Sequence, residues 1–186
     1  MDSYHNLPTL SREFREDINS MRAIAVILVL LFHLDFSTFQ GGYLGVDIFF
    51  VISGYLITKS LITKLKAGNF QFRDFYFGRI KRLFPALFTT ILLCLVIGAT
   101  ILTPNSIDRL ASSAFYSVIS LSNIFFFTEA GYFDPDSSLK PLLHTWSLSV
   151  EEQFYLVWPF VLYFTYKFRL KLLMVLNFVF SFFLLA

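Results

Sequence analysis

Arg22 and His33 are two polar residues within an otherwise apolar stretch, and His33 follows Arg22 by eleven residues. At about 100° and about 1.5 Å per residue, eleven helical steps return to almost the same face and rise about 16 Å, so both side chains would point the same way. A neutral imidazole in a dry cleft suits general-base chemistry, in which His33 takes a proton from an attacking hydroxyl. The structural alternative is a cation at the helix end for Arg22 and a hydrogen bond between helices for His33.

Asp47 is the carboxylate that we expect to support His33. If the hairpin between the first two apolar stretches turns near residue 40, the two residues lie at a similar depth. A carboxylate bonded to one ring nitrogen fixes the tautomer and stabilises the imidazolium that forms when the other nitrogen accepts a proton. Asp35 would point about 200° away from His33 on a helix and is interpreted as an exposed interfacial group.

A second set of polar residues is expected on one face of a later helix. Its members follow one another at steps of 3, 4, 4 and 3 residues: His144, Ser147, Glu151, Tyr155 and Trp158. Such a stripe on an otherwise apolar helix faces the protein interior or a cavity. Glu151 is the catalytic candidate, and the candidates for binding the molecule that carries the reacting hydroxyl are His144, Trp146, Ser147 and Tyr155, since aromatic rings suit an apolar ligand face. The alternative is capping and dipole stabilisation at a helix N-terminus.

Arg79 and Arg82 are one helical turn apart. Guanidinium groups match phosphate geometry, so these two residues, together with Arg22, are candidates to bind an anionic ligand that carries phosphates. Ordinary anchoring of a basic segment at the cytoplasmic membrane surface is the alternative. The one cysteine, Cys94, offers no metal-ligand spacing, and we expect no metal site and no bound cofactor.

Long apolar segments must position these residues. The chain of 186 residues is 56% hydrophobic and 15% charged, against roughly 25% charged residues in an average soluble domain. A helix needs about 20 residues to cross a hydrocarbon core about 30 Å thick. Six such segments are predicted, at residues 18–36, 43–62, 83–103, 107–127, 146–168 and 170–186. The predicted fold is an all-α, polytopic transmembrane helix bundle over residues 18–186, preceded by a cytoplasmic segment over residues 1–17.

The basic residues indicate the orientation in the membrane. The stretch between the second and third segments contains seven cations, Lys59, Lys64, Lys66, Arg73, Arg79, Lys81 and Arg82, and a single acidic residue, Asp74. The positive-inside bias places this stretch, and with it the N-terminus, in the cytoplasm. The cluster of Lys167, Arg169 and Lys171 would then lie outside if every segment spans once. A fourth segment that only enters the membrane removes this conflict, and both topologies stay open.

Several of these residues belong to longer motifs. The first lie at residues 18–26 (INSMRAIAV), 32–33 (FH) and 42–58 (GYLGVDIFFVISGYLIT). The later ones lie at residues 75–76 (FY), 79–87 (RIKRLFPAL), 122–123 (SN) and 142–159 (LLHTWSLSVEEQFYLVWP). In this order they closely resemble the acyltransferase 3 family, of the O-antigen acetylase type, over residues 17–166. The family's common Asp-Gly before the Leu-Arg of its first motif is replaced here by Asn19-Ser20-Met21 before Arg22.

The resemblance implies an integral membrane O-acyltransferase of roughly ten transmembrane helices, of which this chain contains about half. Such enzymes take an acyl group, most often acetyl, from a cytoplasmic donor such as acetyl-CoA and modify a glycan outside the cytoplasm. The family's Arg and His motif corresponds to Arg22 and His33, its basic motif to Arg79 and Arg82, and its Trp-Ser-Leu and Glu motif to residues 146–148 and Glu151. An acyl-His intermediate is one variant of this chemistry.

The implied partners are the lipid bilayer of a bacterial cytoplasmic (inner) membrane, an acyl-CoA co-substrate and a glycan or lipid-linked saccharide acceptor, with no nucleic acid. The acceptor would be lipopolysaccharide O-antigen, peptidoglycan or an exopolysaccharide. Further helices, and in several relatives a hydrolase-like domain, follow the region that this chain covers. Two alternatives keep the same residues: a proton-coupled membrane transporter subunit, and an inactive structural fragment of a split acyltransferase.

Overall fold

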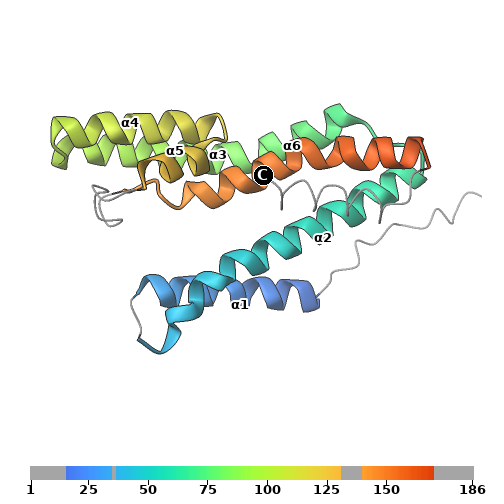
Figure 1. The fold of residues 1–186 in the computed structure, drawn as a ribbon, viewed down its shortest axis with the longest axis horizontal. Helices are drawn as coiled ribbons and strands as arrows, with labels where there is room; N and C mark the ends of the chain where they lie inside the picture. Colours follow the sequence, from blue (N-terminus) through green and yellow to red (C-terminus); the bar gives the residue numbers. More distant parts are fainter. Residues whose placement is uncertain (1–15, 35–36, 131–139, 170–186) are drawn as a thin grey trace, which may run out of the picture. The chain divides into compact units, whose positions relative to one another are not determined.

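The computed structural model describes residues 16–34, 37–130 and 140–169. The predicted sixth segment at 170–186, most of the cytoplasmic segment at 1–17, and Asp35 lie outside these residues. The described elements are helical, and no strand occurs among them. They are α1 (Glu16–His33), the 3-10 helix η1 (Ser37–Tyr43), α2 (Leu44–Lys66), α3 (Phe72–Ile101), α4 (Pro104–Val118), α5 (Ser122–Glu129) and α6 (Thr145–Lys167), as Figure 1 shows. The all-α prediction is therefore confirmed for the part of the chain that the structure describes.

Two of the predicted segments differ from the observed helices. The third helix, α3, begins at Phe72 rather than at Leu83, so the basic stretch around Arg79 is helical. The fourth predicted segment is not one helix, because α4 ends at Val118 and α5 begins at Ser122. Ser120, between them, has a φ of 58°, in the left-handed region that ends a right-handed helix. The 15 residues of α4 rise only about 22 Å, less than a hydrocarbon core of about 30 Å.

Two helical stretches among the described residues are long and apolar enough to cross a membrane, by length and composition. They are Thr38–Lys66 and Phe72–Ile101, and only 22% and 17% of their most apolar windows are buried. A core helix of a soluble protein would be mostly buried. Large apolar side chains of α3, such as Leu92 at 61% and Val96 at 58%, are instead exposed. An apolar surface of this kind is what a lipid environment requires.

The chain divides into two compact units, Met1–Tyr55 and Leu56–Ala186. In the first unit, α1, η1 and the first turns of α2 form a hairpin. Glycines allow this hairpin to close: a Cβ at Gly42 would lie 2.2 Å from the carbonyl oxygen of Leu28, and one at Gly45 would lie 2.6 Å from that of Ala25. These contacts are made with backbone, which cannot move aside as a side chain can. The absence of a side chain at Gly42 and Gly45 therefore lets α1 pack directly against the returning segment.

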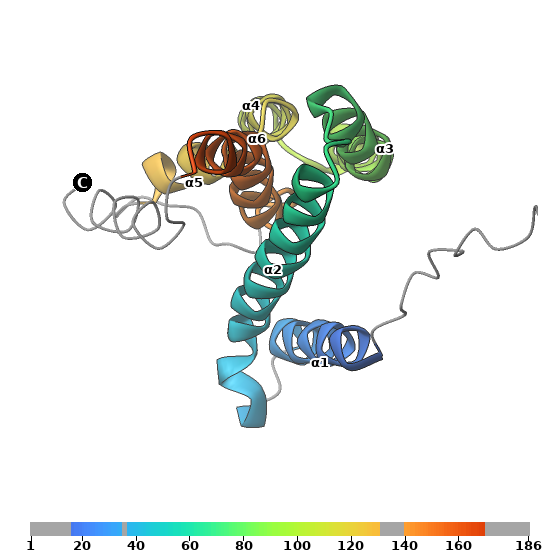
Figure 2. The same cartoon turned by 90° about the vertical axis from the view of Figure 1, so that its right-hand side faces the viewer.

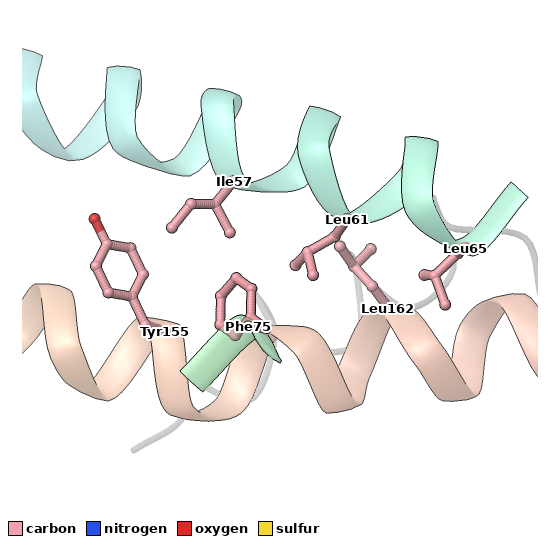
Figure 3. Packing of buried hydrophobic residues seen from close by; sticks show 6 residues of the cluster. All are labelled: Ile57, Leu61, Leu65, Phe75, Tyr155 and Leu162. Carbon is pink, nitrogen blue, oxygen red and sulfur yellow. The ribbon is translucent and has the colours of Figure 1, made fainter. Parts of the chain in front are cut away.

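In the second unit, the axes of α3, α4 and α6 are roughly parallel, with α3 running in the opposite sense to the other two (Figure 1), and the three helices are seen close to end-on in Figure 2. One apolar cluster joins the second half of α2 to α3 and α6, through Ile57, Leu61, Leu65, Phe75, Tyr155 and Leu162 (Figure 3). Another joins α3, α4 and α5 to the turn that precedes α6, through Leu87, Ile91, Leu110, Ala114, Phe126 and Leu142. Buried hydroxyl pairs add to the apolar contacts between α4, α5 and α6. Ser117 lies 2.8 Å from Thr145, and Ser122 lies 2.7 Å from Ser149, measured between the side-chain oxygens.

Candidate functional site

His33 is the last residue of α1, and its side chain is exposed. Its Nδ1 lies 2.8 Å from the carbonyl oxygen of Val29, one turn earlier. Because a carbonyl can only accept a hydrogen bond, Nδ1 carries the proton and Nε2 of the neutral ring keeps a free lone pair. The helix itself thus fixes the tautomer that a general base needs, which is the task that the sequence analysis gave to Asp47.

Asp47 does not pair with His33 in this hairpin. Gly45 faces Ala25 and Val29 of α1, and in antiparallel helices Asp47, two residues later, is level with residues 23–27 rather than with His33. Two helical steps also turn the side chain about 200° away from the face that Gly45 presents to α1. The expectation of a turn near residue 40 was wrong, because η1 already belongs to the returning segment. Asp47 is exposed, and its catalytic role stays a prediction.

Arg22 and His33 lie in one uninterrupted helix, α1, so the geometry that puts them on one face is present. Arg22 is half-buried. Both residues, with Asp47, belong to the unit Met1–Tyr55. Their roles in donor binding and catalysis stay predictions.

In the second unit, the structure brings together the basic stretch of α3 and the predicted polar face of α6. The guanidinium of Arg79, on α3, lies 5.0 Å from the centre of the Tyr155 ring and 5.5 Å from that of Phe75. Tyr155, on α6, donates its hydroxyl hydrogen to Glu151 Oε1. A cation over an aromatic face is stabilised by the ring quadrupole. Arg79 therefore meets the predicted polar face of α6, where Glu151 contributes a negative charge.

Trp158, the last member of that face, donates from Nε1 to Thr58 Oγ1 at 2.7 Å, and its ring stacks on Phe154 at 5.3 Å. Tyr155 and Trp158 thus take part in packing α6 against α2 and α3 as well as in the polar face. Tyr155 is visible at the edge of the apolar cluster in Figure 3, with its hydroxyl pointing away from Phe75 and Leu162.

A cavity of about 300 Å³ adjoins Arg79. Its polar wall consists of Tyr76, Arg79, Ser120, Glu152 and Gln153, together with Tyr155, which the sequence predicted as a site residue. Much of the remainder is apolar and includes Leu83, Phe84 and Ile119. Arg79, which the sequence predicted as a ligand-binding residue, therefore borders a cavity large enough to hold part of a ligand.

Other predicted site residues do not line this cavity. Arg82 lies one helical turn after Arg79 on α3, but its side chain is exposed. At the start of α6, Ser147 Oγ donates to the carbonyl oxygen of His144 at 3.1 Å, which is a local contact within the first turns. Trp146 is 39% exposed. Within the described part of the chain, the cavity wall includes none of these four residues and not Glu151 either.

Four polar residues of the wall were not among the predicted site residues: Tyr76, Ser120, Glu152 and Gln153. Ser120 Oγ donates to Glu152 Oε2 at 2.5 Å, and Gln153 Nε2 donates to the carbonyl oxygen of Ser120 at 2.7 Å. Gln153 also donates to Asn123 Oδ1 at 2.9 Å. Glu152 could have been identified from the sequence, because it is a second carboxylate directly after Glu151 in an apolar helix. A search for one polar face passes over it, because adjacent residues lie about 100° apart.

The chain belongs to the acyltransferase 3 family, whose model, described as an acyltransferase domain, matches residues 15–186. The chain is 43% identical over 151 residues to the peptidoglycan O-acetyltransferase OatA of Listeria monocytogenes, and 39% identical over 161 residues to the putative peptidoglycan O-acetyltransferase YrhL of Bacillus subtilis. It is 36% identical over 156 residues to the O-acetyltransferase OatA of Staphylococcus aureus.

These alignments cover 80%, 86% and 83% of this chain but 24%, 25% and 26% of the respective relatives. The chain therefore spans about a quarter of the length of these relatives. No solved structure matches it.

Proposed function

We propose that this chain forms part of an integral membrane O-acetyltransferase of the bacterial cytoplasmic membrane, which transfers an acetyl group from acetyl-CoA to a hydroxyl of peptidoglycan. The family and the names of the relatives support acetyl transfer. Two relatives are named for peptidoglycan, which favours this acceptor over the lipopolysaccharide and exopolysaccharide also expected from the motifs. The two exposed apolar helical stretches support a multi-pass membrane protein.

The observation that carries the donor assignment is Arg79 beside the cavity. Its guanidinium is half-buried between two aromatic rings, near the carboxylate of Glu151, and borders a space of about 300 Å³. A fork of N–H donors at the edge of such a space suits the phosphates of an anionic donor. The basic stretch that contains Arg79 and Arg82 favours the cytoplasmic side, where acetyl-CoA is available.

For the transfer step, we assign proton transfer to His33. Nδ1–H stays bonded to the carbonyl oxygen of Val29, so Nε2 accepts the proton of the acceptor hydroxyl. The hydroxyl oxygen attacks the thioester carbonyl carbon, and the C–S bond breaks. The imidazolium then returns the proton to the departing sulfur. Glu151 and Tyr155 would orient the acceptor, and Asp47 remains a candidate whose contribution has to be measured.

Mass spectrometry of cell-wall fragments tests the proposed acceptor. Cells that produce the protein should contain muropeptides heavier by one acetyl group, and cells without its gene should lack them. A protein that carries the His33→Ala substitution, present at the same level in the membrane, should behave like the deletion. Unchanged muropeptides together with donor-independent proton flux in proteoliposomes would favour the transporter alternative instead.

A further inference from the structure

The cavity beside Arg79 contains a carboxylate that the proposed transfer step does not use. Glu152 Oε2 accepts the hydrogen bond from Ser120 Oγ at 2.5 Å. Glu152 Oε1 is shut off from solvent and has no hydrogen-bond partner in the part of the chain that the structure describes. Native proteins rarely leave a buried polar atom unsatisfied, and where they do, a ligand, a water or a catalytic role is a common reason. Glu152 belongs to the wall of the cavity, so a ligand that occupies the cavity lies beside this residue.

The surrounding contacts hold Glu152 in place from the break between α4 and α5. Ser120 adopts a left-handed φ of 58°, which is unusual for a residue with a side chain. Its backbone carbonyl accepts a hydrogen bond from Gln153, and its hydroxyl donates to Glu152, so two successive residues of α6 bind both parts of Ser120. A backbone conformation of this kind persists when several contacts determine it, and such positions cluster at ligand sites.

The rest of the cavity restricts the chemistry of the ligand. Arg79 supplies the positive charge of the wall, and Leu83, Phe84 and Ile119 belong to its apolar part. A mostly apolar site with a few polar groups binds a ligand by burying its carbon skeleton and orients it by those groups. The fitting ligand has an anionic group for Arg79, a largely apolar portion, and an N–H or O–H group for the carboxylate.

We propose that Glu152 is a ligand-binding residue, whose carboxylate accepts a hydrogen bond from an amide N–H or a hydroxyl of the substrate in this cavity. This inference rests on the proposed function, since it takes the ligand to be a substrate of acetyl transfer. Two substrates of acetyl transfer could supply this N–H or O–H group. The pantetheine arm of the acyl donor carries amide N–H groups on an apolar chain, and the saccharide acceptor carries hydroxyls and acetamido groups.

Binding measurements on the purified full-length protein in lipid nanodiscs distinguish these sources. Three probes are titrated: coenzyme A, adenosine 3′,5′-bisphosphate, which has phosphates but no amide arm, and a peptidoglycan disaccharide. With Glu152→Gln, the affinity for either coenzyme A or the disaccharide should fall about tenfold, because a hydrogen bond to a charged acceptor is roughly twice as strong as a neutral one. The affinity for adenosine 3′,5′-bisphosphate should stay the same. Asp108→Asn, which neutralises an exposed carboxylate on α4, should change none of the three affinities.

A second variant keeps the test independent of how well Glu152→Gln folds. Ser120→Gly permits the φ of 58° without steric cost and removes only the hydroxyl that orients Glu152. It should weaken the same probe that Glu152→Gln weakens. Wild-type affinities for all three probes in both variants would overturn the inference, and so would an equal loss for all three. If the wild-type protein binds neither coenzyme A nor the disaccharide, the proposed function itself fails, which is a different result.

Discussion

Gly42 and Gly41 are neighbours in η1 that should respond in opposite ways to the same substitution. A Cβ added at Gly42 would lie 2.2 Å from the carbonyl oxygen of Leu28 and 2.8 Å from Phe32 Cβ, whereas a Cβ at Gly41 meets nothing within 4 Å. Inserting a methyl group into a packed contact costs about 1–3 kcal/mol, and the upper part of this range applies because the atom in the way is backbone. At an open position, alanine instead stabilises by about 0.4–1 kcal/mol, because it reduces the entropy of the unfolded chain.

The assay is thermal unfolding of the full-length protein in detergent. A change of 1 kcal/mol shifts the midpoint by about 2–4 °C in a domain of 150–250 residues and by less in a longer protein, and Gly42→Ala should lower the Tm of the full-length protein accordingly. Gly41→Ala should leave it unchanged or raise it slightly. Since α1 carries His33, Gly42→Ala should also reduce acetyl transfer. Equal Tm values for the two variants would show that α1 and η1 do not pack as described, and the register argument about Asp47 would fail with them.

Three further predictions concern the second unit. Ser149→Ala removes the oxygen that bonds both Oγ and N–H of buried Ser122, at 2.7 and 3.3 Å, and should cost about 1–3 kcal/mol, whereas Ser112→Ala at an exposed site should cost less than about 0.5 kcal/mol in the same unfolding assay. Trp158→Phe and Thr58→Val each break the same 2.7 Å hydrogen bond. The double variant should therefore lose less free energy of unfolding than the sum of the losses of the two single variants, and a loss equal to that sum would argue against the bond. Arg79→Gln should weaken binding of coenzyme A about 10- to 100-fold, while Arg73→Gln, at an exposed position, should not; equal affinities would remove Arg79 from the donor site.

The hydrophobic pattern predicts α1, α2 and α6 to within a few residues, apart from the C-terminal end of α2, because long apolar runs end at polar residues there. It fails at the start of α3, because the basic residues of 73–82 look like a loop although their helix propensity is high. It also fails at Ser120, where no glycine or proline marks the break. Gln153, distant in sequence, binds the Ser120 carbonyl there, and a contact of this kind is absent from any local pattern.

For the site, the same-face spacing predicts the Glu151 and Tyr155 contact correctly, since it depends only on helical geometry. The expected pair of His33 and Asp47 depended on where a hairpin turns, and η1 shifts that register. The role of Glu152 depends on which helix packs against the second face of α6. The spacing of residues within one helix does not show which other helix packs against it, so the cavity could be identified only from the structure.

The central claim is that His33 moves the proton in acetyl transfer. The most direct measurement is a single turnover with purified full-length protein in liposomes, using radiolabelled acetyl-CoA and a peptidoglycan acceptor, with wild-type protein and His33→Gln. The account predicts labelled acceptor with the wild type and a rate about 10²- to 10⁴-fold lower with His33→Gln, while coenzyme A binding is kept. Equal rates for the two proteins would contradict it.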